Sequence, residues 1–275
     1  MNKLKEVYGL LHNTYGPQGW WPIVNDKTLL CEYHTNAPKN EAESFEIAVG
    51  AILTQGTQWY PNVVRAIQQL KLGRTLTIKE WEVLREAEIS QKKISGNEQL
   101  ITQDNILTQN TSWTNVEKAL KELYDSGNLS RGRIRALPVG EIAGLIRSAG
   151  YFNQKAKKLK LLADFKGEIT RENLLGIWGI GLETADSILL YAYQEPVFVV
   201  DAYTRRIFSR LGLVGTDVSY DDIQKVFHEN LKKDVKIFKE YHALIVEHAK
   251  RHCRANPECN GCPIAKFCKC NSEVL

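Results

Sequence analysis

The chain has 275 residues, of which 43% are hydrophobic and 25% are charged, and its formal net charge is +4. This is the composition of a globular protein of about two domains, and it argues against a disordered or collagen-like chain. No stretch approaches the roughly 18 apolar residues of a membrane-spanning helix. The first residues lack the apolar centre of a secretory signal, so we expect a cytoplasmic protein with no membrane partner.

Helical periodicity dominates the sequence. Apolar residues recur at helical spacing in residues 185–192, 223–231 and 241–248, and Ser219 is a candidate N-cap for the second of these helices. Strand-like alternation is weak throughout. The apolar run 197–200 has the character of a strand, but one short run does not make a sheet. We therefore expect an all-α protein.

One internal repeat precedes these helices. The sequence ILTQGTQW at 52–59 is echoed by ILTQNTSW at 106–113, and each copy leads into an amphipathic segment. Two copies are fewer than the roughly three repeats that a solenoid needs. We interpret the repeat as a duplicated or inserted helical segment at about residues 54–108.

A glycine-rich turn lies between two predicted helices, in the sequence LGIWGIG at 175–181. Gly179 and Gly181 permit a tight turn. They would also expose backbone N–H groups at a helix N-terminus, where a phosphate binds well. A plain connection between two helices remains the alternative.

Asp201 comes directly after the apolar run 197–200. An aspartate in this position can be partly desolvated and can act on a positive charge that develops in a reaction. It can equally cap the helix that follows, or do both.

Five of the six cysteines lie near the end of the chain. Cys253, Cys259, Cys262 and Cys268 fall within one short loop that contains a single Cys-x2-Cys pair. Four thiolates in one loop suit a [4Fe-4S] cluster, which takes four cysteine ligands. Structural zinc is the alternative, and disulfides are disfavoured in a reducing cytosol. Cys270 is interpreted as a bystander.

The hairpin, the aspartate about twenty residues later and the four-cysteine loop occur in an order that resembles the helix-hairpin-helix DNA glycosylases of the endonuclease III superfamily. The resemblance covers nearly the whole chain apart from the insertion. It implies a two-domain all-α fold with a DNA cleft between the domains. The barrel domain would span 43–196 and carry the hairpin and the insertion, and the second domain would join 1–42 to 197–275 with the iron–sulfur loop.

The resemblance also implies site residues. Asp201 would be the catalytic aspartate, which stabilises an oxocarbenium-like sugar and assists attack by water. Gly179 and Gly181 would contact DNA phosphates. The partner would be double-stranded DNA with a damaged base, bound by a monomeric, nucleoid-associated enzyme.

Glu183 is a departure from the family pattern. Bifunctional members carry a lysine nucleophile at this position, and a carboxylate cannot form the Schiff base that the lyase reaction needs. We therefore expect a monofunctional glycosylase without AP lyase activity. A solvent-facing acid in the first turn of a helix is the alternative explanation of Glu183. The first gap in the cysteine loop is five residues instead of the six that are usual in the family.

The pair Trp20-Trp21 before Pro22, together with Phe45 and Glu183, is similar to the 3-methyladenine DNA glycosylase III branch. In that branch the second tryptophan and the phenylalanine line the base pocket, which assigns Trp21, Phe45 and Glu183 to substrate binding. A base flipped out of the duplex stacks on aromatic faces, and a methylated purine, being cationic, adds a cation–π attraction. These aromatic residues could instead belong to the core.

Two further positions complete the resemblance. A glutamine that fills the gap left by the flipped base is matched by both Gln55 and Gln109, with a slight preference for Gln109. The pocket lysine of the branch has no counterpart, since Leu244 stands at the aligned position.

The sequence thus predicts a monofunctional DNA glycosylase that acts on an alkylated purine such as 3-methyladenine. A glycosylase for deaminated or mismatched bases is one alternative. A non-catalytic DNA-binding protein that recognises damage, with Asp201 only as a helix cap, is the other.

Overall fold

A computed structural model describes residues 2–25, 27–28, 31–33, 38–53, 83–84, 87, 131–145 and 151–269. Gln55, Gln109 and most of the predicted insertion lie outside these residues. Within the described part of the chain, no helix has both the length and the apolar character needed to cross a bilayer.

The described residues are mostly helical. The helices are α1 (Lys3–Tyr15), α2 (Glu41–Leu53), α6 (Arg131–Ala136), α7 (Val139–Leu145), α8 (Phe152–Asp164), α9 (Arg171–Leu175), α10 (Leu182–Ser187), α11 (Ala202–Arg210), α12 (Tyr220–Asn230) and α13 (Val235–Arg251), with a π-helical turn η3 (Ile188–Ala192) and a 3₁₀ turn η4 (Ala265–Phe267). The sequence did not predict the short antiparallel pair β1 (Ile23–Val24) and β2 (Cys31–Glu32). A pair of two-residue strands forms no layer, so the all-α prediction is confirmed.

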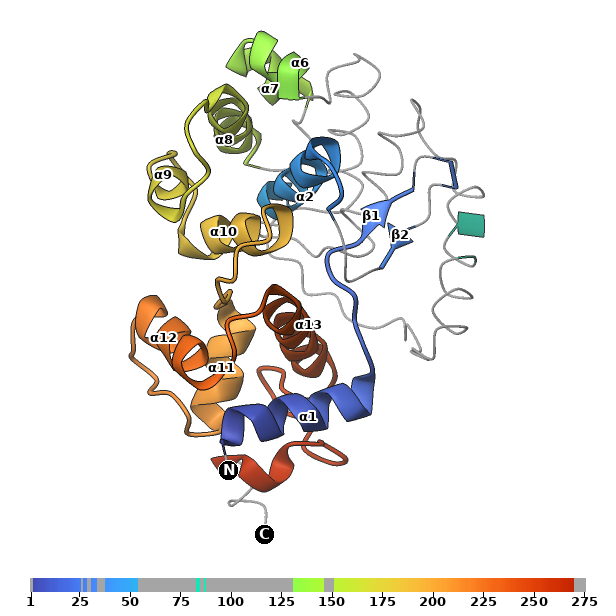
Figure 1. The fold of residues 1–275 in the computed structure, drawn as a ribbon, viewed down its shortest axis with the longest axis vertical. Coiled ribbons are helices and arrows are strands. Elements are labelled where there is room, and N and C mark those ends of the chain that lie inside the picture. Colours follow the sequence, from blue (N-terminus) through green and yellow to red (C-terminus); the bar gives the residue numbers. More distant parts are fainter. Residues whose placement is uncertain are drawn as a thin grey trace.

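The helices form two groups (Figure 1). In the upper group α8 packs against α2, α6 and α7, and α10 packs against α2 and α9. In the lower group α13 packs against α1 and α11, and α1 also meets α12. The turn η3 continues α10 and reaches α13, so it connects the two groups. The chain therefore has the two-domain arrangement expected from the resemblance.

The N-terminal helix belongs to the same group as the C-terminal cysteine loop. Lys266 in η4 forms an ion pair with Glu6 in α1 at 2.7 Å, and Figure 1 shows α1 next to the red C-terminal segment in the lower group. The two ends of the sequence thus build one body together.

The three periodic segments form helices as expected. Residues 185–192 form α10 and η3, in which Ala185, Ile188, Leu189 and Ala192 are all buried. Ser219 caps α12, because its hydroxyl accepts a hydrogen bond from the Asp222 amide at 3.1 Å. The apolar faces are therefore buried as predicted, except that Val226 and Leu231 at α12 are only partly buried against the core.

The run 197–200 is extended but belongs to no strand in the described chain. It is buried instead in an aromatic core, where Phe198 stacks on Phe227 with ring centroids 3.8 Å apart and meets Phe238 edge-on. Phe198, Val199 and Val200 are each at most 3% exposed. Burial of such side chains stabilises by roughly 1.5–3 kcal/mol each, which anchors the segment that leads to Asp201.

A buried carboxylate connects the hairpin to the lower group. Asp186 in α10 is fully buried and receives hydrogen bonds from Arg171 Nε at 2.7 Å and Arg171 Nη2 at 3.1 Å. Gln224 Nε2 of α12 donates to the same carboxylate at 2.7 Å and also to the Phe198 carbonyl at 2.7 Å. A buried charge is tolerated only when it is paired and hydrogen-bonded in this way.

We expect Asp186→Ala to lower the free energy of unfolding by about 3–5 kcal/mol, because it leaves Arg171 without its buried partner. Equilibrium urea unfolding measures the change. Asp221→Ala is the matched control: Asp221 pairs with the same arginine at 2.9 Å, but its side chain is 62% exposed, so its loss should cost under about 1 kcal/mol. Equal losses in the two variants would contradict the structural role of Asp186.

Candidate functional site

The glycine-rich turn connects α9 to α10 as a tight hairpin. Gly179 has φ +83°, in the left-handed region that favours glycine, and a side chain there would collide with that of Lys158. Gly181 is the N-cap of α10, and its carbonyl accepts from the Ala185 amide at 2.9 Å. Ile177 and Ile180 are buried while both glycines are exposed. The hairpin thus anchors its apolar residues inside and presents its backbone to solvent.

Lysines of α8 lie beside this hairpin. Lys157 Nζ is 4.2 Å from the ring centroid of Trp178, a hairpin residue that is 48% exposed. Lys158 lies against Gly179. Lys155, by contrast, is 5% exposed and points into the molecule. The basic run of α8 therefore offers only part of its charge to a partner at the hairpin.

Asp201 is the N-cap of α11 and faces other polar groups as well. Its Oδ1 accepts from the Thr204 amide at 2.7 Å and from the Thr204 hydroxyl at 2.8 Å. Its Oδ2 lies 3.6 Å from His242 Nε2, and its side chain is 12% exposed. Capping uses one carboxylate oxygen and leaves the other directed at the interior of the site.

Asp201 is held in its ionised form. Burial by itself raises the pKa of Asp201, but interactions with His242 and the two hydrogen bonds from Thr204 outweigh burial and bring the pKa below its usual value. Those partners favour the charged form of the carboxyl group. The site therefore contains a negative charge at neutral pH, in a place where little water screens it.

Glu183 lies in the first turn of α10 and belongs to the same region. Partial burial raises the pKa of Glu183, the negative charge of Asp201 raises it further, and His242 opposes both. Glu183 nevertheless remains solvent-accessible. The hairpin helix thus brings a second carboxyl group into the electrostatic field of Asp201.

The tryptophan pair packs against Tyr191 and His242, next to this site. Trp21 packs edge-on against Tyr191 with centroids 4.9 Å apart, and Trp20 packs edge-on against His242 at 6.2 Å. Tyr191 Oη and His242 Nδ1 are 2.6 Å apart. Trp21 is 8% exposed and contributes to the core, so its burial agrees with the alternative explanation. It is linked to Asp201 indirectly, through Tyr191 and His242. The Trp20–Trp21 peptide bond is cis.

Phe45 lies in α2, half-buried against the core. Among the described interactions, Phe45 has no direct contact with Asp201 or with Trp21. Gln55 and Gln109 lie outside the described residues, so the prediction that one of them fills the gap in the duplex stays a prediction.

Sequence reasoning missed three residues of this region. Tyr191 and His242 join the tryptophans to Asp201, and Lys239 of α13 is 4% exposed with its Nζ 3.4 Å from the Tyr191 carbonyl. Burial lowers the pKa of Lys239 to about 8. The sequence could have indicated only that Lys239 and His242 are neighbours, because a spacing of three residues places them on one face of α13. Leu244 is fully buried in the same helix.

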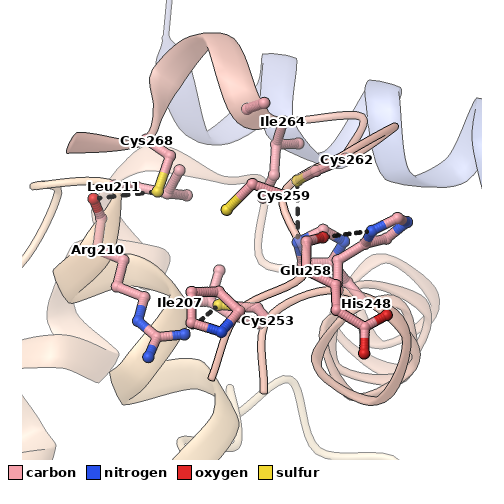
Figure 2. A pocket seen from close by; sticks show the side chains of 13 residues that line it. Ile207, Arg210, Leu211, His248, Cys253, Glu258, Cys259, Cys262, Ile264 and Cys268 are labelled. Atoms are coloured by element: carbon pink, nitrogen blue, oxygen red, sulfur yellow. Dashed lines mark hydrogen bonds between the residues drawn. The ribbon is translucent and has the colours of Figure 1, made fainter. Parts of the chain in front are cut away.

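The four cysteines of the loop surround one pocket (Figure 2). Arg210 Nη1 is 3.2 Å from Cys253 Sγ, and Cys268 Sγ is 3.7 Å from the Arg210 carbonyl. Cys262 Sγ is 3.8 Å from His248 Nε2. The apolar wall is made by Ile207, Leu211 and Ile264. All four thiols are unbridged.

The donor set of this pocket fits an iron–sulfur cluster. The pocket holds about 380 Å³ of empty space, part of it open to solvent. In the described part of the chain, no group of three His, Cys, Asp or Glu side chains is close enough together to hold a metal ion, so the fit rests on the number and type of the thiols that line the pocket. Burial and then the other three thiols raise the pKa of Cys262, so a positively charged guest would relieve the repulsion among four thiolates.

Two arginines after Asp201 have structural partners. Arg206 Nε donates to the Cys253 carbonyl at 2.8 Å, and Arg205 Nη1 donates to the Val218 carbonyl at 2.6 Å. They hold the cysteine loop and the segment before α12 in place.

Comparison with known proteins agrees with this arrangement. The HhH-GPD superfamily of base excision DNA repair proteins matches residues 104–233. A provisionally named DNA repair glycosylase of Methanocaldococcus jannaschii is 48% identical over 179 residues, which cover 59% of this chain and 81% of that protein. Endonuclease III of Sulfolobus acidocaldarius is 30% identical over 176 residues, covering 60% of this chain and 78% of that enzyme.

Among solved structures, the 3-methyladenine DNA glycosylase of H. pylori bound to 1,N6-ethenoadenine superposes with a TM-score of 0.53. The identity is 22%, and the match covers 91% of this chain and 98% of that one. This similarity shows the shared fold. The sequence relatives establish that the chain belongs to the HhH-GPD superfamily of base excision DNA repair proteins and, within it, to the DNA glycosylases.

Proposed function

We propose that this protein is a monofunctional DNA glycosylase that hydrolyses the N-glycosidic bond of an alkylated purine, such as 3-methyladenine, in double-stranded DNA. The observation that carries the proposal is the ionised carboxylate of Asp201, held by Thr204 and close to Glu183 and His242. The tryptophan pair packs on His242 and Tyr191 next to it. The shared fold with a 3-methyladenine DNA glycosylase supports it.

Asp201 is proposed to act on the sugar. As the bond from C1′ to the base breaks, positive charge develops on the sugar ring. A fixed carboxylate stabilises that charge strongly because the site is poorly solvated and the carboxylate does not have to reorient. The oxygen Oδ2, which Thr204 does not use, is the atom available to face the sugar and the attacking water.

Glu183 is proposed to make the enzyme monofunctional. A Schiff base requires an amine, and the side chain in the first turn of the hairpin helix is a carboxyl group. We propose further that Gly179 and Gly181 contact DNA phosphates, because the hairpin exposes both glycines and lysines of α8 lie next to it. Such contacts would make binding salt-dependent.

We expect Asp201→Asn to reduce base release from methylated duplex DNA by about 10²-fold or more, since it removes the charge that stabilises the transition state. Binding to DNA should persist, because no phosphate contact is lost. Single-turnover analysis of free bases and a gel-shift assay measure the two quantities. Wild-type release should occur without strand nicking and without a borohydride-trapped adduct, and a trapped adduct would contradict the role given to Glu183.

The same assay separates the alternatives. Duplexes with uracil, hypoxanthine or a T·G mismatch are tested beside the methylated duplex. Release of one of these bases in place of 3-methyladenine would keep Asp201 and replace the substrate. Binding with no release from any duplex would identify a damage-recognising protein that lacks catalysis.

We propose that Trp21 and Phe45 contact the flipped base. Trp21→Ala should reduce release of 3-methyladenine by about 5- to 150-fold, the equivalent of 1–3 kcal/mol of stacking per base. Trp21→Phe, which keeps an aromatic face, should lose less. Because a cation–π attraction requires a cationic base, any residual release of neutral hypoxanthine should fall less than that of 3-methyladenine. Unchanged release by a folded Trp21→Ala variant, checked by its thermal midpoint, would reject the pocket role.

We propose that Cys253, Cys259, Cys262 and Cys268 hold a [4Fe-4S] cluster, on the evidence of the four-thiol pocket. Bound there, the cluster would supply a cross-link, through four iron–thiolate bonds, that stabilises the loop. The chain's own contribution is the placement of the thiols by contacts of the loop with α11 and α13.

Purified protein should therefore be brown and contain about four iron atoms per chain. Cys259→Ser should lose the visible absorption band and lower the thermal midpoint. Cys31→Ser, which removes a cysteine outside the loop, is the matched control and should retain both colour and stability. One zinc per chain, with no iron, would overturn the cluster assignment.

We propose domain boundaries at 43–196 for the barrel and at 1–42 with 197–275 for the second domain. The packing of α8 and α10 on α2, and of α1 and α11 on α13, supports this division. The family match begins at residue 104 and so includes the repeat copy with Gln109, which supports Gln109 over Gln55 as the residue that enters the duplex. The enzyme is proposed to act as a nucleoid-associated monomer.

A further inference from the structure

We infer that His242 is a positioning residue for Asp201, one that holds the carboxylate in a single orientation and in its charged form. This inference rests on the proposed catalytic role of Asp201. It adds a residue of α13 that no motif of the sequence indicates, and it gives a function to a buried polar atom that protein packing alone leaves unexplained.

The first observation is an unsatisfied buried nitrogen. His242 is 6% exposed, and within the described structure its Nε2 is buried without a hydrogen-bond partner. That atom lies 3.6 Å from Asp201 Oδ2, slightly beyond the usual range of 2.7–3.2 Å. Buried polar atoms are nearly always paired, and active-site hydrogen bonds are often long until the substrate binds. A small movement would close this one.

The second observation concerns the other ring nitrogen. His242 Nδ1 lies 2.6 Å from Tyr191 Oη, while the same hydroxyl is 3.5 Å from the Lys239 carbonyl. The hydroxyl carries a single proton, and the shorter contact is the one to the imidazole. If Tyr191 donates to Nδ1, the neutral ring must carry its proton on Nε2. If Nδ1 donates instead, Nε2 can face a carboxylate favourably only when the ring is doubly protonated. An N–H is therefore directed at Asp201 when Tyr191 donates, and otherwise only when the ring carries both protons.

The geometry of Asp201 completes the argument. Its Oδ1 is fixed by two hydrogen bonds from Thr204, so the direction of Oδ2 is fixed as well, towards His242. Trp20 packs edge-on against the imidazole and limits its rotation. The chain from Tyr191 through His242 to Asp201 is therefore a relay in which the tyrosine sets the tautomer and the histidine holds the acid.

Other titratable groups around this pair do not duplicate the role of His242. Glu183 from α10 carries the same charge sign as Asp201, and Tyr203 from α11 and Tyr191 from η3 are neutral phenols whose pKa values burial raises, with the charge of Asp201 raising them further. Two more groups face Tyr191 from α13. These are Lys239, above the ring, and Glu240.

The test is the pH dependence of single-turnover base release, with spontaneous base loss subtracted. His242→Phe removes an interaction that favours the charged form of Asp201, so the pKa of Asp201 should rise. The acid limb of the profile should then move to higher pH by about one unit. His242→Gln, which keeps an N–H donor, should shift the limb less. A purely structural role would lower the amount of active enzyme and leave the limb in place.

His228→Gln is the matched control. His228 is a partly buried histidine whose Nε2 accepts from the Phe198 amide at 2.9 Å, so it supports the segment before Asp201 without touching the carboxylate. The acid limb of the His228→Gln profile should stay at the wild-type pH. Tyr191→Phe provides a second test if His242→Phe does not fold. Without the hydroxyl, the position of the proton on the His242 ring is no longer fixed, so the acid limb should move to higher pH although the imidazole remains.

The outcomes are distinguishable. Acid limbs that stay at the wild-type pH in the folded His242 and Tyr191 variants, with Asp201→Asn inactive, would overturn the inference alone. Wild-type rates in Asp201→Asn would overturn the proposed function itself. The expected result is an acid limb that moves to higher pH in His242→Phe, moves less in His242→Gln and does not move in His228→Gln.

Discussion

The architecture of the site depends on the buried carboxylate of Asp186. This residue sits two positions after Thr184 in the hairpin helix, yet its partners are Arg171 of α9 and Gln224 of α12. Gln224 donates in addition to the carbonyl of Phe198. A single polar network therefore joins the hairpin to the lower group of helices and to the segment that delivers Asp201. Because a buried charge is stable only with all of its partners, this network permits little change in their relative position.

The proposed catalytic region draws its residues from elements that are distant in the sequence. Asp201 caps α11, Glu183 lies in the first turn of α10, and Tyr191 lies in η3. His242 lies in α13, and the tryptophan pair precedes β1. Each of these elements is fixed by its apolar face, not by the polar groups of the site. The cost of burying the carboxylate is therefore offset by helix packing and by the hydrogen bonds from Thr204.

Helix α11 has a second task at its other end. Arg206 holds the carbonyl of Cys253, and Arg210 contacts the thiol of the same residue. The helix that Asp201 caps thus also binds the cysteine loop. The ion pair between Lys266 and Glu6 attaches α1 to the same loop. A cluster bound by the loop, as proposed above, would accordingly stabilise the helix that Asp201 caps.

Local patterns in the sequence determined the helices and the motifs. Apolar spacing predicted the buried faces of α10, α12 and α13, Ser219 marked a cap, and the order of hairpin, aspartate and cysteines indicated the family. These features are local, so they follow from a few neighbouring residues. The exposed hairpin glycines and the positive φ of Gly179 are likewise local features that the sequence of the turn indicates.

Tertiary structure alone decided which polar groups meet. Lys155 lies in a lysine-rich helix and is nevertheless buried, Arg206 follows Asp201 closely and binds the cysteine loop, and His242, which belongs to no motif, faces Asp201 at 3.6 Å. The apolar periodicity in residues 241–248 does not include residue 242, and it does not show which element the helix packs against. Contacts between segments tens to hundreds of residues apart depend on how whole helices pack, and the sequence pattern of one helix contains no information about its neighbour.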